Sequence, residues 1–267
     1  MRRSRLVVFL SSLLLAVGAA LTGATAAQGA ETAATGYVAL GDSYSSGVGA
    51  GSYISSSGDC KRSTKAYPSL WAAANSPSSF NFTACSGART DEVLAHQTGP
   101  LGAGTGLVSL SIGGNDAGFA DIMTTCVLQS DSACLSRINT GRAYVTSTLP
   151  GKLDTVYSTI RTKAPSAQVV VFGYPRFYQL GQSCLGLSET KRKAINDASD
   201  LLNSTIAKRV ADHGFTFADV RSTFTGHEIC SGNSWLHSVN WLNVGESYHP
   251  TAAGQSGGYL PALNNAA

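Results

Sequence analysis

Short β-rich runs alternate along this chain with longer segments of helical character, and this alternation constrains the fold more than any other feature. The β-rich runs cover residues 37–40, 80–83, 107–112, 169–172 and 215–218. The helical segments cover residues 65–74, 91–97, 136–163 and 188–213. Strands that alternate with helices favour a parallel sheet covered by helices on both faces. The continuous apolar runs at 107–112 and 169–172 fit strands buried on both sides. We therefore predict the α/β class.

The chain shows no internal repeat, low-complexity linker or shift in composition, so we expect a single domain over residues 31–267. Only 13% of the residues are charged while 43% are hydrophobic, which argues against a disordered chain. The net charge of +3 arises from Arg2, Arg3 and Arg5, since 16 basic residues face 16 acidic ones after residue 30. This balance gives no electrostatic support for a nucleic-acid partner.

The first 30 residues have the pattern of a secretory signal peptide. A cationic start is followed by an apolar stretch over residues 6–21 and then by small residues up to Ala30. An uncleaved membrane anchor is the alternative, but the apolar stretch is short for a bilayer span of about 20 residues. We expect cleavage between Ala26 and Glu31, giving a secreted, extracellular protein with no stable membrane insertion.

Six cysteines, an even number in an exported chain, favour disulfides. None of them is spaced as C-x-x-C, which makes a zinc site unexpected. The sequence by itself leaves the pairing open, and Cys126 with Cys134 is the most local option.

The residues that follow each strand are candidates for chemistry, because ligands of α/β proteins bind beyond the carboxyl ends of the strands. After the first strand comes the segment 41–47, Gly-Asp-Ser-Tyr-Ser-Ser-Gly. Ser43 has small neighbours at a strand-to-helix turn, where backbone N–H groups surround it and suit a nucleophile. A helix cap is the alternative reading, since Asp and Ser both cap helices well.

Two further segments at strand ends carry glycines. The segment 85–89 contains Gly87, and the segment 113–116 contains Asn115. Glycine lets the backbone approach a ligand closely, and the Asn115 amide offers an N–H donor of the kind that holds a developing oxyanion. Ordinary turn formation is the alternative explanation for both segments.

A long segment at 223–249, rich in Gly, Ser, Asn and Trp, has weak periodicity and is typical of a functional loop. It ends with His249, whose backbone is restricted by the following Pro250. His249 is the general-base candidate. The other histidines are expected to be solvated or structural: His96, His213, His227 and His237.

With these segments in order, the sequence resembles the SGNH (GDSL) hydrolases. The four invariant residues of that family correspond to Ser43, Gly87, Asn115 and His249, and the likeness covers essentially the whole mature chain. More narrowly, the sequence is similar to the secreted lipases and phospholipases of actinomycetes (Streptomyces type) in its G-D-S-Y-S-S-G start, its six cysteines and its S-Y-H-P-T end.

The resemblance implies a flavodoxin-like three-layer α/β/α sandwich with a central parallel sheet, and no metal or organic cofactor. It implies that Ser43 is the nucleophile and that His249 acts first as base and then as acid. The backbone N–H groups of Ser43 and Gly87 would form the oxyanion hole with the Asn115 amide. The disulfides implied by the resemblance are Cys60–Cys85, Cys126–Cys134 and Cys184–Cys230.

The third member of the catalytic group departs from the family pattern. Many of these enzymes have Asp three residues before the histidine, and here that position holds Glu246, which is longer by one methylene. Close relatives suggest instead that the backbone carbonyl of Ser247 orients His249. We expect this dyad, with the Glu246 carboxylate as the less favoured alternative.

The expected activity is hydrolysis of carboxylic esters in lipids, including triacylglycerols, phospholipids and p-nitrophenyl esters, by a monomer. Deacetylation of polysaccharide is an alternative, and a non-catalytic secreted binding protein is a weaker one. Five apolar residues shortly before the base either line an acyl pocket or belong to the core: Trp235, Leu236, Trp241, Leu242 and Tyr248.

Overall fold

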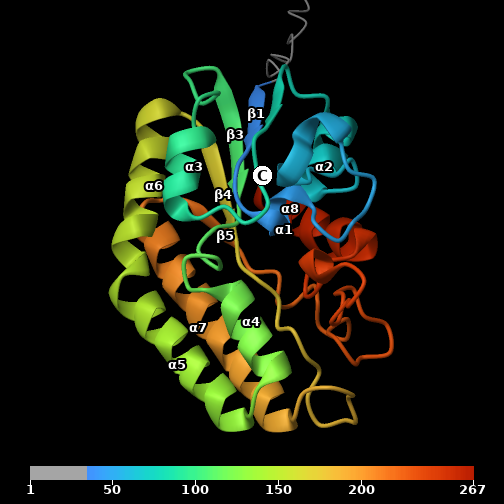
Figure 1. Ribbon diagram of the computed structural model, residues 1–267. Helices are drawn as coiled ribbons and strands as arrows, with labels where there is room; N and C mark the ends of the chain where they lie inside the picture. The colour runs from blue at the N-terminus through green and yellow to red at the C-terminus, as the bar shows by residue number, and fades with distance from the viewer. Residues whose placement is uncertain (1–34) are drawn as a thin grey trace, which may run out of the picture. The chain divides into compact units, whose positions relative to one another are not determined.

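The computed structural model describes residues 35–267, which form an α/β fold around one five-stranded parallel sheet (Figure 1). The signal peptide and cleavage site expected from the sequence lie outside the described residues. The strand order β2-β1-β3-β4-β5 is that of flavodoxin-like doubly wound folds. The predicted fold class is therefore confirmed. The strands are β1 (Gly36–Ala39), β2 (Phe80–Phe82), β3 (Thr105–Leu110), β4 (Gln168–Phe172) and β5 (Thr216–Ala218).

All five strands overlap the β-rich runs of the sequence, and the inner strands are the most apolar because they are buried on both faces. The central strand β3 buries Val108 and Leu110 completely, and its neighbour β4 does the same with Val170 and Val171. The edge strand β2 is shorter, and its first residue, Phe80, is partly exposed. The sequence therefore locates the centre of the sheet more strongly than its edges.

Helices lie on both sides of the sheet. Helices α3 (Thr90–His96), α6 (Leu149–Lys163) and α7 (Glu189–Asp212) cover one side, and α2 (Tyr67–Asn75) and α8 (Leu260–Ala266) cover the other (Figure 1). Helices α4 (Phe119–Leu128) and α5 (Asp131–Ser147) pack with the first half of α7 beyond the carboxyl ends of the strands. Shorter helical segments are α1 (Ser43–Ser46), Ser55–Cys60, Val244–Glu246 and Gly254–Tyr259.

One predicted helical segment, 136–163, is two helices in the structure. Helix α5 ends at Ser147 and α6 begins at Leu149, with Pro150 in its first turn. Proline is favourable in a first turn but breaks a helix interior, because it lacks the N–H and its ring collides with the preceding turn. No helix within residues 35–267 has the length and apolarity to cross a membrane.

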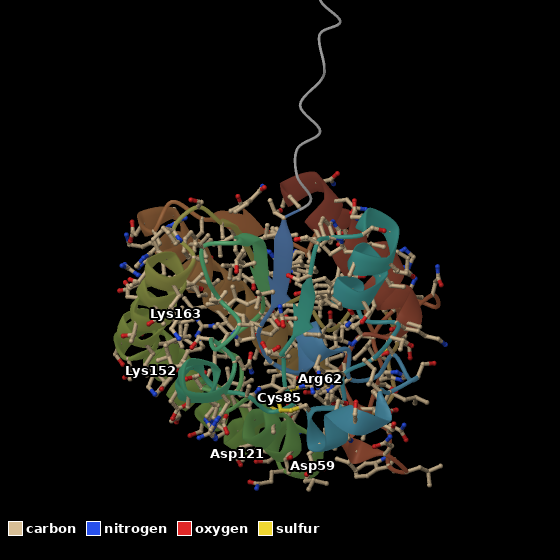
Figure 2. All side chains as sticks on the ribbon, turned by 90° about the horizontal axis from the view of Figure 1, so that it is seen from above. Asp59, Arg62, Cys85, Asp121, Lys152 and Lys163 are labelled. Carbon is tan, nitrogen blue, oxygen red and sulfur yellow. A yellow bond between two sulfur atoms is a disulfide. The ribbon has the colours of Figure 1, made fainter. Side chains whose placement is uncertain are left out.

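Three disulfides hold the loops, and they join the same pairs that the family resemblance implied. Cys60–Cys85 links the segment after β2 to the end of the short helix Ser55–Cys60. In Figure 2, Cys85 is labelled together with Asp59 and Arg62, the neighbours of Cys60 in this region of the chain. Cys126–Cys134 ties α4 to α5, and Cys184–Cys230 joins two long loops.

The turn after β1 depends on Gly41. Its φ is +121°, and a Cβ there would lie 2.5 Å from the Ser111 carbonyl oxygen and 2.8 Å from the Ser111 nitrogen. Both atoms belong to the backbone that follows β3. Displacing this backbone would disturb the sheet and cost free energy. Only glycine therefore lets the chain turn sharply while β1 and β3 stay paired.

We predict that Gly41→Ala lowers the free energy of unfolding by about 3 kcal/mol or more, because it combines an unfavourable φ with a backbone clash. Gly102→Ala is the matched control, since its Cβ would meet nothing within 4 Å and its φ is not positive. Urea titration of both variants measures the difference. Equal stability of the two variants would contradict this account of the turn.

Candidate active site

Ser43 is presented at the carboxyl end of β1 by the first turn of α1. Asp42 caps this helix, because its side chain accepts a hydrogen bond from the Tyr44 N–H at 3.0 Å. Gly47, with a φ of +87°, ends the helix after four residues. Asp42 thus has the capping role that the sequence left open for Ser43, and the serine hydroxyl is available for other contacts.

The Ser43 hydroxyl meets the imidazole of His249. His249 Nε2 lies 2.7 Å from Ser43 Oγ, although the two residues are 206 positions apart in the chain. His249 Nδ1 lies 3.0 Å from the carbonyl oxygen of Ser247. A carbonyl can only accept, so Nδ1 carries the proton and Nε2 is left with a free electron pair facing the serine hydroxyl.

The backbone before His249 is held in an unusual conformation. Tyr248 has a φ of +66°, in the left-handed region that tyrosine rarely adopts. Its carbonyl accepts from the Tyr44 hydroxyl at 2.7 Å, and its N–H donates to the His237 carbonyl at 3.0 Å. Its own hydroxyl is hydrogen-bonded to the Tyr178 hydroxyl at 3.0 Å. These bonds stabilise the backbone that aims the imidazole at Ser43.

The carboxylate of Glu246 has a partner other than the histidine. Glu246 Oε1 accepts from the Tyr53 hydroxyl at 2.7 Å, and that hydroxyl in turn accepts from the Gly49 N–H at 3.0 Å. Of the two candidate orienting groups, the carbonyl of Ser247 is the one that contacts His249 Nδ1. This geometry favours the dyad over the carboxylate alternative.

The loops that carry Gly87 and Asn115 are bonded to each other. Asn115 Nδ2 donates to the Ala88 carbonyl at 3.1 Å, and the Thr90 hydroxyl donates to the Asp116 carboxylate at 2.6 Å. Among residues 35–267, the backbone N–H groups of Ser43 and Gly87 have no hydrogen-bond acceptor. Two N–H donors and a fixed amide are therefore available for a substrate oxygen.

Asp42 connects the turn that carries Ser43 to the Asn115 loop. Its buried carboxylate accepts from the Ser111 hydroxyl at 2.7 Å and from the Tyr174 hydroxyl at 2.5 Å. The Tyr174 oxygen also accepts from the Gly114 N–H at 3.2 Å, one residue before Asn115. Burial raises the pKa of Asp42 to about 6, against the lowering effect of the hydrogen bonds that it accepts.

Burial also shifts the titration of the histidine. Loss of hydration lowers the pKa of His249 to about 4, and the backbone hydrogen bonds at Ser247 and Glu246 oppose this shift without cancelling it. The imidazole is therefore neutral at neutral pH, which is the form that can accept a proton from the serine.

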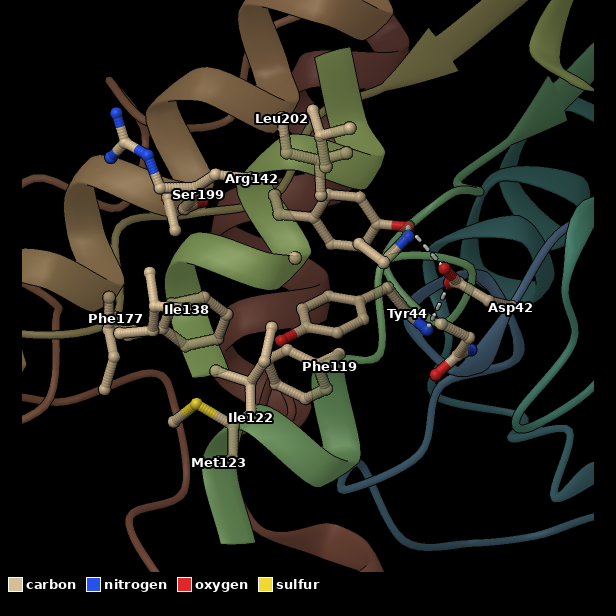
Figure 3. Close-up of a pocket in the computed structure, with 18 of the residues that line it drawn as sticks. Asp42, Tyr44, Phe119, Ile122, Met123, Ile138, Arg142, Phe177, Ser199 and Leu202 are labelled. Atoms are coloured by element: carbon tan, nitrogen blue, oxygen red, sulfur yellow. Dashed lines mark hydrogen bonds between the residues drawn. The ribbon is translucent and has the colours of Figure 1, made fainter. Parts of the chain in front are cut away.

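An apolar cleft begins at Ser43 and Asn115. It extends between α4, α5 and α7 (Figure 3). Ile195 and Leu202 of α7 line this cleft and also pack in the core. The other large apolar residues along its walls are Phe119, Ile122, Met123, Ile138, Val145 and Phe177.

The aromatic and apolar residues near the base do not line this cleft. Leu236 and Tyr248 are buried, and Trp235 packs against Phe224, in agreement with the core alternative. Trp241 and Leu242 are exposed, so both alternatives are wrong for them. The cleft is instead lined by apolar side chains of three helices. In the sequence these side chains look like ordinary core residues, so no pattern marks them as a binding site.

Three of the other histidines have structural contacts. His213 Nε2 lies 3.0 Å from the Asp154 carboxylate, and His237 Nε2 lies 2.8 Å from the Gly49 carbonyl. His227 stacks on the ring of Trp235. Within residues 35–267, no group of three or more His, Cys, Asp or Glu side chains is arranged to hold a metal ion.

The site combines a serine hydroxyl, a neutral histidine bonded to it and free N–H donors beside it, all at the carboxyl ends of a parallel sheet. This is the arrangement of an α/β serine hydrolase. The comparisons agree with this class. Residues 39–256 match the GDSL-like Lipase/Acylhydrolase family, and the chain belongs to this family. The resemblance found in the sequence is thereby confirmed.

Individual relatives are similar over their whole length. The chain is 78% identical to Lipase 1 of Streptomyces coelicolor and 65% identical to a lipase of Streptomyces rimosus, each with 100% of both chains covered. Among solved structures it is similar to phospholipase A1 of Streptomyces albidoflavus NA297, with 69% identity and a TM-score of 0.87. It is also similar to the extracellular lipase of Streptomyces rimosus, with 67% identity and a TM-score of 0.86. Each of these two alignments covers 88% of this chain and 100% of the solved one.

We predict that Glu246→Ala retains most of the esterase activity, because the carboxylate contacts Tyr53 and not the imidazole. His249→Ala should lose activity by at least about a thousandfold, as expected when a general base is removed from a serine hydrolase. Steady-state kcat/KM on a soluble ester separates the two variants. A loss in Glu246→Ala as large as that in His249→Ala would overturn the dyad.

The pH dependence of kcat/KM should report two groups. His249 acts as base only when neutral, so its lowered pKa predicts an acid limb near pH 4 rather than near 6.5. When Asp42 is protonated near pH 6, its carboxyl group can no longer accept hydrogen bonds from both Ser111 and Tyr174. This change should add a smaller step near pH 6 to the profile of kcat/KM. Asp42→Asn should abolish the step near pH 6 and keep the limb near pH 4. A single limb at about 6.5 in both proteins would contradict both assignments.

Proposed function

We propose that this protein is a serine esterase that hydrolyses fatty-acyl ester bonds of lipids through an acyl-enzyme on Ser43. The observation that carries this proposal is the 2.7 Å contact between Ser43 Oγ and His249 Nε2 at the mouth of an apolar cleft. The names of the similar proteins, lipases and a phospholipase A1, support the same class of substrate.

In the first half of the reaction, Ser43 Oγ attacks the ester carbonyl carbon while its proton passes to His249 Nε2. The tetrahedral intermediate collapses when the imidazolium gives that proton to the leaving alcohol oxygen and the carbon–oxygen bond breaks. In the second half, a water molecule loses its proton to Nε2 and attacks the acyl-enzyme. The fatty acid then leaves, and the Ser43 oxygen regains its proton.

The developing oxyanion is stabilised by three donors: the N–H groups of Ser43 and Gly87, and the Asn115 amide. The two N–H groups need no rearrangement, because they have no acceptor among residues 35–267. An amide carries two N–H bonds, so Asn115 can bind Ala88 with one and the oxyanion with the other. Losing one such donor costs about 3 kcal/mol of transition-state stabilisation.

The cleft selects the acyl part of the substrate. Its walls are large apolar side chains from three helices, which offer favourable burial to each methylene of a fatty-acyl chain, about 0.8 kcal/mol each. An acetyl group would leave most of this surface unused. The cleft therefore favours lipid esters over acetylated polysaccharide.

We further infer that residues 31–267 act as one domain outside the cell, as a monomer. The single sheet supports one domain, and the three disulfides and the signal-peptide pattern support export from the cell. The similar solved lipase of Streptomyces rimosus is described as extracellular.

A long-chain alkyl phosphonate with a p-nitrophenyl leaving group tests the mechanism. We expect one covalent adduct, located on Ser43 by mass spectrometry of peptides, with parallel loss of hydrolysis of emulsified triacylglycerol and phospholipid. Ser43→Ala should give no adduct. Folded protein that is not labelled would instead indicate a binding protein. Faster turnover of acetylated xylan than of long-chain esters would favour the polysaccharide alternative.

A further inference from the structure

Three large apolar side chains project into solvent shortly before the base. Trp241 is 69% exposed, Leu242 101% and Val244 63%, and we call them the apolar tip. Residues 239–245 contain no charged side chain. Large apolar residues gathered in this way are uncommon on a soluble surface unless they bind something.

The backbone of the loop is built to hold these side chains outward. The Asn240 side-chain oxygen accepts from the N–H groups of Leu242 and Asn243, both at 3.1 Å. The Asn240 N–H donates to the Ser247 hydroxyl at 2.9 Å, and the Glu246 N–H donates to the Asn243 carbonyl at 2.9 Å. Hydrogen bonds within the loop therefore hold its backbone, while its large apolar side chains remain exposed.

The apolar tip and His249 belong to the same loop. The loop is closed at its base by hydrogen bonds of 3.0 Å from the His237 N–H to the His249 carbonyl and from the Tyr248 N–H to the His237 carbonyl. Tyr248 packs edge-on against Phe119, which lines the cleft. The tip is thus carried by the same loop as His249, and Tyr248 of that loop contacts a wall residue of the acyl cleft.

A positive charge lies beside the tip. Lys61 Nζ lies 3.5 Å from the position that a Cβ on Gly245 would occupy. Glu246, the nearest acidic residue in the loop, is hydrogen-bonded to Tyr53. An apolar tip flanked by a lysine matches a lipid surface with anionic headgroups, since tryptophan favours the interface and lysine favours the negative charge.

We propose that the apolar tip docks the enzyme on the surface of aggregated lipid and so presents the acyl cleft to its substrate. This inference rests on the proposed lipid esterase function and adds how the substrate is reached. A second copy of the chain is the less suitable occupant, because three side chains bury far less than the roughly 800 Å² per partner of a stable interface.

Vesicle binding tests the proposal without hydrolysis. In a Ser43→Ala background, we compare the unchanged tip with W241S/L242S by co-sedimentation with vesicles of phosphatidylcholine and phosphatidylglycerol. The double substitution should weaken binding at least about tenfold. Leu128→Ser is the matched control, since it removes a side chain that is 65% exposed at the end of α4, and it should bind as before. Equal binding by all three proteins, or equal loss in the control, would overturn the proposal.

Kinetics with intact Ser43 give a second readout. W241S/L242S should keep the kcat/KM of the parent on p-nitrophenyl acetate below its solubility limit and lose at least about tenfold on vesicles. Equal loss on both substrates would mean that the tip acts on the site itself, and would refute docking. Sedimentation velocity that shows a dimer abolished by W241S/L242S would assign the tip to a second copy instead. If the parent enzyme hydrolyses neither ester, the proposed function fails, while the vesicle experiment still decides the docking surface.

Discussion

The hydrogen bond from the Tyr44 hydroxyl to the Tyr248 carbonyl joins the two halves of the active site. Tyr44 follows the proposed nucleophile and Tyr248 precedes the proposed base, so this buried bond of 2.7 Å clamps segments that are 204 residues apart. The clamp also supports the left-handed backbone of Tyr248, a conformation that costs on the order of 1–3 kcal/mol. With other backbone angles the imidazole would point elsewhere, and Ser43 would have no base.

A second constraint is the buried carboxylate of Asp42, at the point where the order of the sheet reverses between β1 and β3. It receives donors from the turn after β1, from Ser111 after β3 and from Tyr174 after β4. Burying a carboxylate is costly unless hydrogen bonds satisfy it. These bonds offset that cost and fix the distance between Ser43 and the Asn115 loop. The fold and the site therefore share one polar network.

The sequence predicts the five strands and the residues at their ends because both depend on local patterns. Continuous apolar runs mark β3 and β4, and Ser43 and Asn115 stand directly after strands. The cleft could not be predicted, because Phe119, Ile138 and Leu202 come from three helices and become neighbours only when those helices pack. The length of the loop before His249 predicts a functional loop, but weak periodicity carries no information on which side chains face inward. Trp241 and Leu242 were therefore misplaced.

His249 is oriented by a backbone carbonyl and not by a carboxylate. The positive charge of its imidazolium form must therefore be stabilised by another group. The Ser247 carbonyl fixes the tautomer, but it offers the imidazolium only a dipole. Burial disfavours the imidazolium further, as the lowered pKa of His249 shows. In the proposed mechanism, the compensating negative charge is the oxyanion itself, which forms nearby at the moment when the imidazolium forms. The proposed mechanism therefore depends on the donors proposed to hold the oxyanion, and the hydrogen bonds between the Gly87 and Asn115 loops, with the link from Gly114 through Tyr174 to Asp42, fix those donors in place.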